Sequence, residues 1–139
     1  MKRFDEIHVS EIIEYNKIEC PRRNESFGVK TELLLEIIGK VNQLSDIKFD
    51  RERVLKQAST LMGLVVFEQP FNNANKSTAT VVTIDFLHAN GFDLELSGIK
   101  LQTELLDILE KIMYLFEDES RKGIFMVEEF LEKHLKKLH

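Results

Sequence analysis

The stretch with the most chemical content lies mid-chain, at Asn72–Thr78 (NNANKST). It combines turn-forming asparagines with a lysine and two hydroxyl residues, directly before a hydrophobic segment that we expect to be helical. The first backbone N–H groups of a helix have no partner within it, and the helix dipole attracts anions to that end. Together with the charge of Lys76, this arrangement predicts a site for a phosphate group or a nucleotide.

The residues before this stretch place it in a loop. Pro70 disfavours right-handed helical backbone at Gln69, so the preceding helix should end near that residue. Phe71 is expected to anchor the loop in the hydrophobic core. The segment Glu68–Lys76 is therefore predicted to connect two hydrophobic segments.

Periodic apolar residues predict helices on both sides of this loop. The chain contains only two prolines and six glycines, which fall mostly between periodic segments. We predict an all-α fold: a single compact bundle of about six helices spanning residues 1–139. The expected helices are 10–18 with Ser10 as N-cap, 31–41 capped by Thr31, 51–67 capped by Asp50, 77–90, 97–117 and 124–138.

The segment Ser77–Asn90 is the ambiguous one. Its β-branched run Thr80–Ile84 could form a strand by propensity alone. A single strand among helices would have no pairing partner, whereas Ala79, Val82 and Phe86 also fit a buried helix. We therefore predict a central helix that ends at Asn90 and Gly91.

Composition excludes several classes of protein. The chain has 139 residues, 43% of them hydrophobic, a net charge of -5 and a pI of about 5.4. An acidic protein is not expected to bind nucleic acid generally. The lone Cys20 suits a reducing compartment, and the histidines lack zinc-ligand spacing. We find neither a signal peptide nor a run of about 18 apolar residues, so the protein is expected to be cytoplasmic, without membrane insertion.

The stretch Gln69–Thr78 (QPFNNANKST) resembles the signature of the Fic/Doc family. That signature reads His-x-Phe-x-Asp/Glu-Gly/Ala-Asn-Gly/Lys-Arg-Thr and precedes a buried helix. The Ala-Asn-Lys form is closest to the death-on-curing branch, and looser similarity extends to Ile12–Lys17, Phe27–Val29 and Leu33–Leu35. The residues that match the signature are Phe71, Ala74, Asn75, Lys76 and Thr78.

The resemblance implies a mechanism. Members of the family move AMP or a phosphoryl group from a nucleotide to a protein hydroxyl, with the His as base and the carboxylate as Mg²⁺ ligand. The implied cofactors are ATP or another nucleotide, and Mg²⁺. The implied phosphate-binding residues are Asn73, Ala74, Asn75, Lys76 and Ser77, with Phe71 as the loop anchor.

Three departures fall on the positions that would carry the chemistry. Gln69 stands at the family His, and an amide does not titrate near neutral pH, so it cannot act as a general base. Asn73 stands at the carboxylate and is a much weaker Mg²⁺ ligand. Ser77 stands where the family has Arg, which removes a bidentate phosphate contact. We expect an impaired or inactive transferase. His88, expected to be at least partly buried about three helical turns along, should lie too far away to replace the base.

Three hypotheses remain open. The first is a catalytically degenerate protein that still binds a nucleotide or phosphate. The second is an active transferase in which Gln69 positions a protein substrate. The third is a non-catalytic helical interaction module, such as one component of a toxin–antitoxin pair whose antitoxin-like partner folds on binding. A large apolar groove would favour the third hypothesis.

Overall fold

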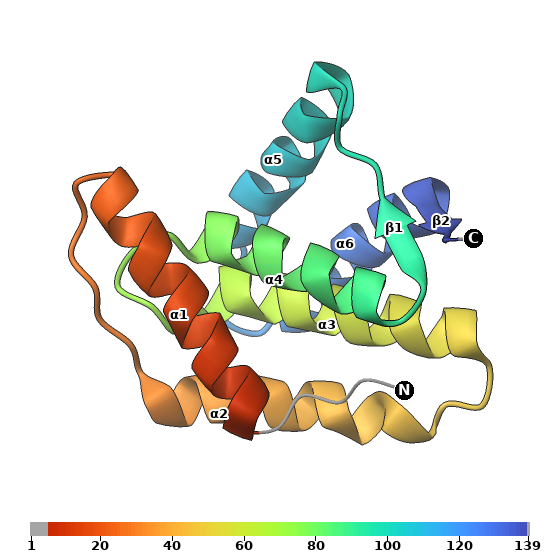
Figure 1. Cartoon of the computed structure of the whole chain (residues 1–139), viewed down its shortest axis with the longest axis horizontal. Helices are drawn as coiled ribbons and strands as arrows, with labels where there is room; N and C mark the ends of the chain where they lie inside the picture. The colour runs from red at the N-terminus through yellow and green to blue at the C-terminus, as the bar shows by residue number, and fades with distance from the viewer. Residues whose placement is uncertain (1–5, 139) are drawn as a thin grey trace.

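The computed structural model describes residues 6–138, and within them the chain forms six α-helices (Figure 1). Residues 1–5 and 139 of the predicted domain lie outside the described part. The all-α prediction is confirmed, as is the helical interpretation of the segment around Thr80–Ile84. The helices are α1 Glu6–Arg22, α2 Thr31–Asn42, α3 Asp50–Glu68, α4 Asn75–Ala89, α5 Ile99–Met113 and α6 Ser120–His134, with a 3-10 turn at Gln43–Asp46.

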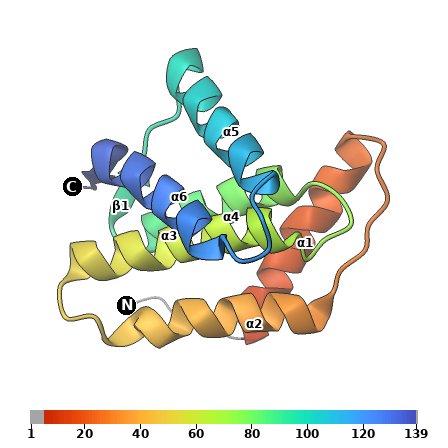
Figure 2. The same ribbon diagram turned by 180° about the vertical axis from the view of Figure 1, so that it is seen from behind.

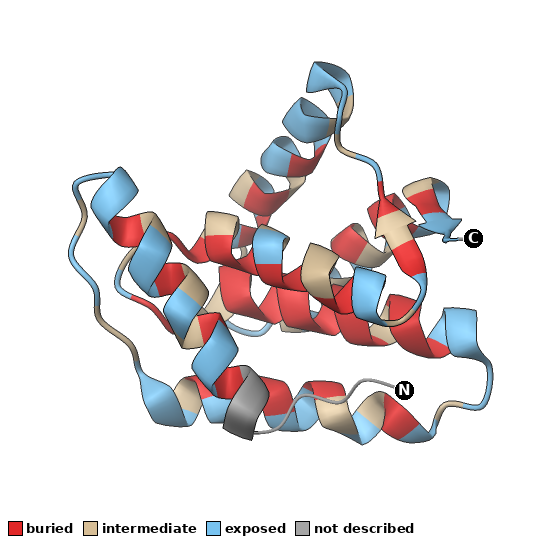
Figure 3. Cartoon of the chain, in the orientation of Figure 1, coloured by how far each residue is buried: buried red, intermediate tan, exposed pale blue. Residues whose placement is uncertain are grey.

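Helix α3 is the centre of the bundle. Its 19 residues include 13 buried ones, and α2, α4 and α6 pack around it (Figures 1 and 2). Figure 3 shows this burial along most of the helix. Helix α1 crosses α4, while α5 contacts α3 and α6 and projects away from the other helices. Neighbouring helices therefore pack against both α3 and α4.

The predicted N-caps were wrong by one or more residues. Ser10 lies inside α1, and the caps of α2 and α3 are Lys30 and Phe49 rather than Thr31 and Asp50. Asp50 instead sits in the first turn, where a carboxylate complements the helix dipole. Its Oδ1 accepts a hydrogen bond of 2.8 Å from Arg53, which holds the pKa of the Asp50 carboxyl below its usual value.

The C-terminal prediction also needs correction. Helix α5 ends at Met113 rather than near Glu117, and α6 runs Ser120–His134 instead of reaching Leu138. The residues that follow form β2 (Leu135–Lys137), which pairs antiparallel with β1 (Phe92–Leu94). The pairing is favourable because it buries Leu135 together with the two apolar residues of β1.

Gly63 and Gly39 provide a matched test of the packing between α3 and α6. A Cβ added at Gly63 would lie 3.0 Å from the backbone Cα of Ile124, whereas one at Gly39 would meet nothing within 4 Å. We predict that Gly63→Leu lowers the free energy of unfolding by about 2 kcal/mol or more through overpacking. Gly39→Leu should raise it by about 0.5–1 kcal/mol, because leucine is the better helix former. Urea unfolding measures both, and a neutral Gly63→Leu would show that the two helices are not in close contact.

Candidate functional site

The connection from α3 to α4 depends on two residues with left-handed backbone. Gln69 caps the C-terminus of α3 with φ 50° and ψ 64°, and its N–H donates to Val65 O at 3.1 Å. Ala74 caps the N-terminus of α4 with φ 60° and ψ 32°. Left-handed backbone costs a residue other than glycine about 1–2 kcal/mol, so other interactions must hold this loop.

Asn75 supplies one of those interactions. Its Oδ1 accepts from the N–H of Phe71 at 3.0 Å, and its Nδ2 donates to the carbonyl of the same residue at 2.9 Å. Phe71 is 2% exposed and belongs to the hydrophobic core. Because a buried backbone group without a partner is costly, the Asn75 side chain allows the phenylalanine to enter the core.

A second loop, residues 23–30, runs alongside the first. The N–H of Lys30 donates to Pro70 O at 2.7 Å, and that of Asn72 donates to Gly28 O at 2.9 Å. These bonds flank an isolated antiparallel bridge between Val29 and Phe71. The loop between α1 and α2 and the loop between α3 and α4 therefore form one unit.

Helix α1 contributes a buried amide that the sequence did not single out. Asn16 is fully buried, and its Nδ2 donates to Asn73 O at 2.8 Å and to Thr78 Oγ1 at 3.1 Å. Its Oδ1 accepts from the thiol of Cys20 at 3.4 Å. Burial, followed by the negative charge of Glu25, raises the pKa of that thiol. The available signal was the four-residue spacing of Ile12, Asn16 and Cys20, which places a polar amide on an apolar helix face.

The start of α4 leaves backbone donors free. Ala74 has no side chain that could cap the helix, and the first helical bond runs from Thr78 N to Ala74 O at 3.0 Å. Within residues 6–138, the N–H groups of Asn75, Lys76 and Ser77 have no hydrogen-bond acceptor. Uncapped amides at a helix N-terminus favour an anion.

A cavity of about 240 Å³ opens at this helix start. Its lining includes Gln69 and the residues Asn72–Lys76, together with Arg23 and Glu25 from the neighbouring loop. Two cationic residues and one acidic residue thus line the cavity together with the first residues of α4. This composition suits an anionic ligand that binds together with a cation.

The structure brings together all of the predicted catalytic and phosphate-binding residues except one. Gln69, Asn73, Ala74, Asn75 and Lys76 line the cavity. The exception is Ser77, which lines the neighbouring groove, and its hydroxyl donates to Ala74 O at 3.4 Å.

Several of these side chains already have partners. Asn75 is used to hold the loop, and Asn73 donates its Nδ2 to Ser26 O at 2.9 Å. Lys76 pairs with Glu110 of α5. An anion that binds Lys76 must therefore share it with this carboxylate, which weakens the contribution of the lysine.

The groove beside the cavity lies between α4 and α5 and has a volume of about 550 Å³. Its walls are largely apolar, and Arg23 and Lys76 line both the groove and the cavity. Two of its leucines are buried, but Leu106 is 50% exposed and Val81 is 37% exposed. An apolar surface therefore lies directly beside the N-terminal end of α4.

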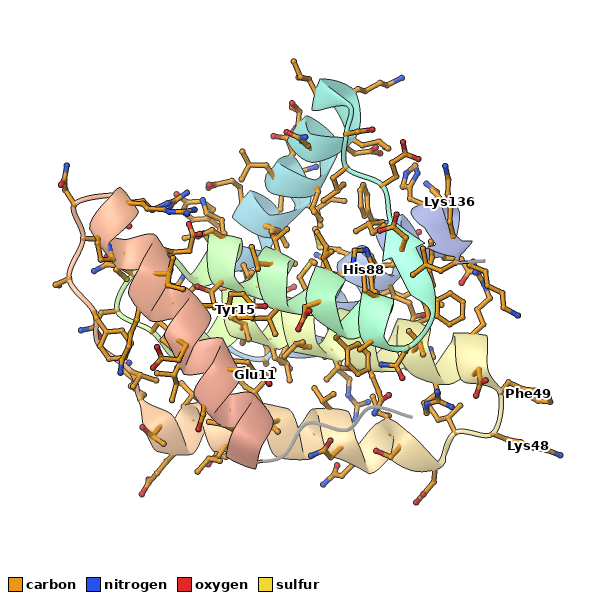
Figure 4. The ribbon with its side chains drawn as sticks, viewed as in Figure 1. Glu11, Tyr15, Lys48, Phe49, His88 and Lys136 are labelled. Atoms are coloured by element: carbon orange, nitrogen blue, oxygen red, sulfur yellow. The ribbon has the colours of Figure 1, made fainter. Side chains whose placement is uncertain are left out.

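His88 is exposed rather than partly buried, so that expectation was wrong. It lies near the C-terminal end of α4, where its Nε2 is 2.6 Å from Asp93 Oδ1 (Figure 4). This end of the helix faces β1 and is remote from the loop that contains Gln69. His88 therefore cannot act as a base beside Gln69, as the sequence predicted.

A metal site formed by the protein alone is not evident. Among the described residues, no three His, Cys, Asp or Glu side chains are grouped closely enough to hold a metal ion. One carboxylate oxygen, Oε1 of Glu25, is buried without a hydrogen-bond partner in the described part of the chain. Likewise, no helix within residues 6–138 is long and apolar enough to cross a bilayer.

Comparisons with known proteins give no match: no family model, no curated protein and no solved structure is similar to this chain. The Fic/Doc resemblance therefore stays a prediction that depends on the motif at Gln69–Thr78.

Asn75→Ala tests whether the loop depends on a single side chain. Removal of the amide leaves the buried N–H and carbonyl of Phe71 without partners, so we predict a loss of about 2–4 kcal/mol in the free energy of unfolding. Asn72→Ala is the matched control, because that exposed side chain makes no such bond. It should change stability by less than about 0.5 kcal/mol. Equal losses of stability for the two variants in chemical denaturation would contradict the role of Asn75 in holding the loop.

Proposed function

We propose that this protein is a nucleotide-binding protein of the Fic/Doc type whose transferase chemistry is impaired or lost. The observation that carries the proposal is the uncapped start of α4, whose first residues line a cavity together with Arg23. The polyphosphate of a nucleotide is the ligand class that matches free amides and cations at a helix N-terminus. In this proposal ATP binds with its phosphates at Ala74–Ser77.

The proposed loss of chemistry follows from the residue at the end of α3. Gln69 lines the cavity, where its amide can donate a hydrogen bond to a hydroxyl or accept one from it, but cannot remove a proton near neutral pH. Loss of a general base typically slows a reaction by about 10²–10⁴. The chain would then bind and orient a nucleotide without transferring part of it efficiently.

The groove favours a second candidate function. A partly exposed apolar surface of this size suits an amphipathic segment of a partner protein, in the helix-in-groove mode. In this alternative, the chain is an interaction module such as a toxin–antitoxin component, and the partner segment covers Val81 and Leu106. A partner there would also reach Lys76, so it would compete with a nucleotide.

Thermal unfolding with and without nucleotides tests the first candidate. A ligand at about 100 times its Kd stabilises the native state by about 2.7 kcal/mol, so ATP and ADP should raise the Tm and adenosine should not. Lys76→Gln should weaken ATP binding about tenfold, since a charge-assisted hydrogen bond contributes about 1.5–3 kcal/mol. Lys100→Gln, which removes an exposed charge at the start of α5, is the control. If no nucleotide shifts the Tm, the groove becomes the better-supported site.

Restoration of the signature tests the chemistry separately. We predict that Gln69→His combined with Asn73→Asp and Ser77→Arg gains transfer of label from ATP to a protein in a cell lysate. ATP labelled at the α-phosphate or the γ-phosphate distinguishes AMP transfer from phosphoryl transfer. The matched control omits only Gln69→His and should remain inactive. A folded triple variant that binds ATP and transfers nothing would contradict the proposed relation to transferases.

A further inference from the structure

Helix α5 presents a line of exposed apolar side chains. Ile99, Leu106 and Met113 are 81%, 50% and 37% exposed, and each follows the previous one by seven residues. Seven residues are close to two helical turns, so the three side chains lie on one face of the helix. Single exposed hydrophobic residues need no explanation, but a continuous stripe of them indicates an interaction surface.

The same helix reaches beyond the bundle. Its buried side chains, Leu105, Leu109 and Ile112, face α3 and α6, and its N-terminal half projects away from the other helices (Figures 1 and 2). None of the residues 99–104 is buried, and Figure 3 shows this end of α5 as exposed. Short helices gain most of their stability from packing. A partner along the stripe would therefore stabilise this half of α5.

The sides of the stripe have little charge. Four residues neighbour Leu106 on the helix surface, three and four positions away on either side. Of these only Glu110 is charged, and it pairs with Lys76 of its own chain. Depletion of charge is typical of the core of a protein interface. The stripe therefore suits another neutral apolar stripe better than a strongly charged segment.

The stripe is symmetric about Leu106. Ile99 and Met113 lie about 10 Å from it along the helix axis, in opposite directions. If two copies of α5 pack antiparallel about a twofold axis at Leu106, Ile99 of each copy meets Met113 of the other. Glu110 then faces Gln102 of the other copy, so no like charges meet, whereas a parallel pairing would bring the two Glu110 carboxylates to the same level.

The apolar surface at this face is of the size that a small dimer needs. Tyr114 and Phe116 follow the end of the stripe and are 81% and 76% exposed. A fully buried aromatic side chain contributes about 150–250 Å², so the two aromatic and three stripe side chains together offer on the order of 600 Å². A specific interface of standard size buries about 800 Å² per partner, polar rim included. The area therefore fits a weak, concentration-dependent dimer.

We propose that this protein forms a homodimer in which the α5 helices of two copies pack antiparallel, with Leu106 on the twofold axis. Leu106 also lines the groove between α4 and α5, as does Val81 of α4, so the second copy covers the open side of that groove. A second copy is favoured over a segment of another protein because the neutral, symmetric stripe is complementary to itself. The inference does not depend on nucleotide binding.

Sedimentation equilibrium of the whole chain tests the dimer. We expect the mass to rise with concentration from 16.2 kDa toward twice that value. Leu106→Glu should weaken association at least about tenfold, because it places two carboxylates against each other on the axis. Leu35→Glu is the matched control, since Leu35 is 43% exposed on α2, away from the stripe, and it should leave the Kd of the dimer unchanged.

Two results of this experiment would overturn the proposal. One is a wild type that stays monomeric up to about 1 mM, where only very weak association would be missed; the groove would then be left to a segment of another protein. The other is a folded Leu106→Glu that associates as tightly as Leu35→Glu, which would place any dimer on a different face. Circular dichroism and the Tm of each variant confirm that folded proteins are compared.

Disulfide cross-linking tests the antiparallel register. In a Cys20→Ser background, Leu106→Cys should give a covalent dimer under mild oxidation, since a disulfide needs Cα atoms within about 7 Å. Ile99→Cys alone and Met113→Cys alone should not, because the two copies of each would lie about 20 Å apart along the axis. A mixture of these two variants should cross-link. Ile99→Cys that cross-links with itself as readily as the mixture does would overturn the proposed pairing.

Discussion

The structure depends on one constraint: the chain must leave buried α3 and enter α4 through a loop whose backbone groups are themselves partly buried. Asn75 satisfies the buried N–H and carbonyl of Phe71, and Asn16 of α1 satisfies the carbonyl of Asn73. The bridge between Val29 and Phe71 adds the neighbouring loop. Since these bonds determine where α4 begins, they also determine where its free amides lie.

This constraint separates the residues that shape the loop from those that would act on a ligand. Phe71, Asn75 and Thr78 are buried and bonded within the protein, so their replacement would disturb the fold. Gln69 and Ser77 are only partly buried at a cavity or groove, where a different side chain costs the fold little. Substitutions at Gln69 or Ser77 should therefore disturb the fold less than substitutions at Phe71, Asn75 or Thr78.

The sequence predicted the helical class and the position of the loop because both follow from local signals, namely periodic apolar residues and the Pro70 and asparagine cluster. It missed the strand at Leu135–Lys137, whose partner lies some forty residues earlier at Phe92–Leu94. It also missed Asn16, since its role comes from contacts between α1 and the loop before α4. Such contacts leave no local pattern in the chain.

The most direct test of the central claim is a titration of the isotope-labelled protein with ATP, followed by the backbone amide resonances in ¹H–¹⁵N NMR spectra. Amides that donate to a bound phosphate change their chemical environment directly. We predict saturable shifts, largest at Asn75, Lys76 and Ser77, with adenosine producing none at these positions. Unchanged resonances at the start of α4, or shifts confined to the groove around Val81 and Leu106, would contradict it.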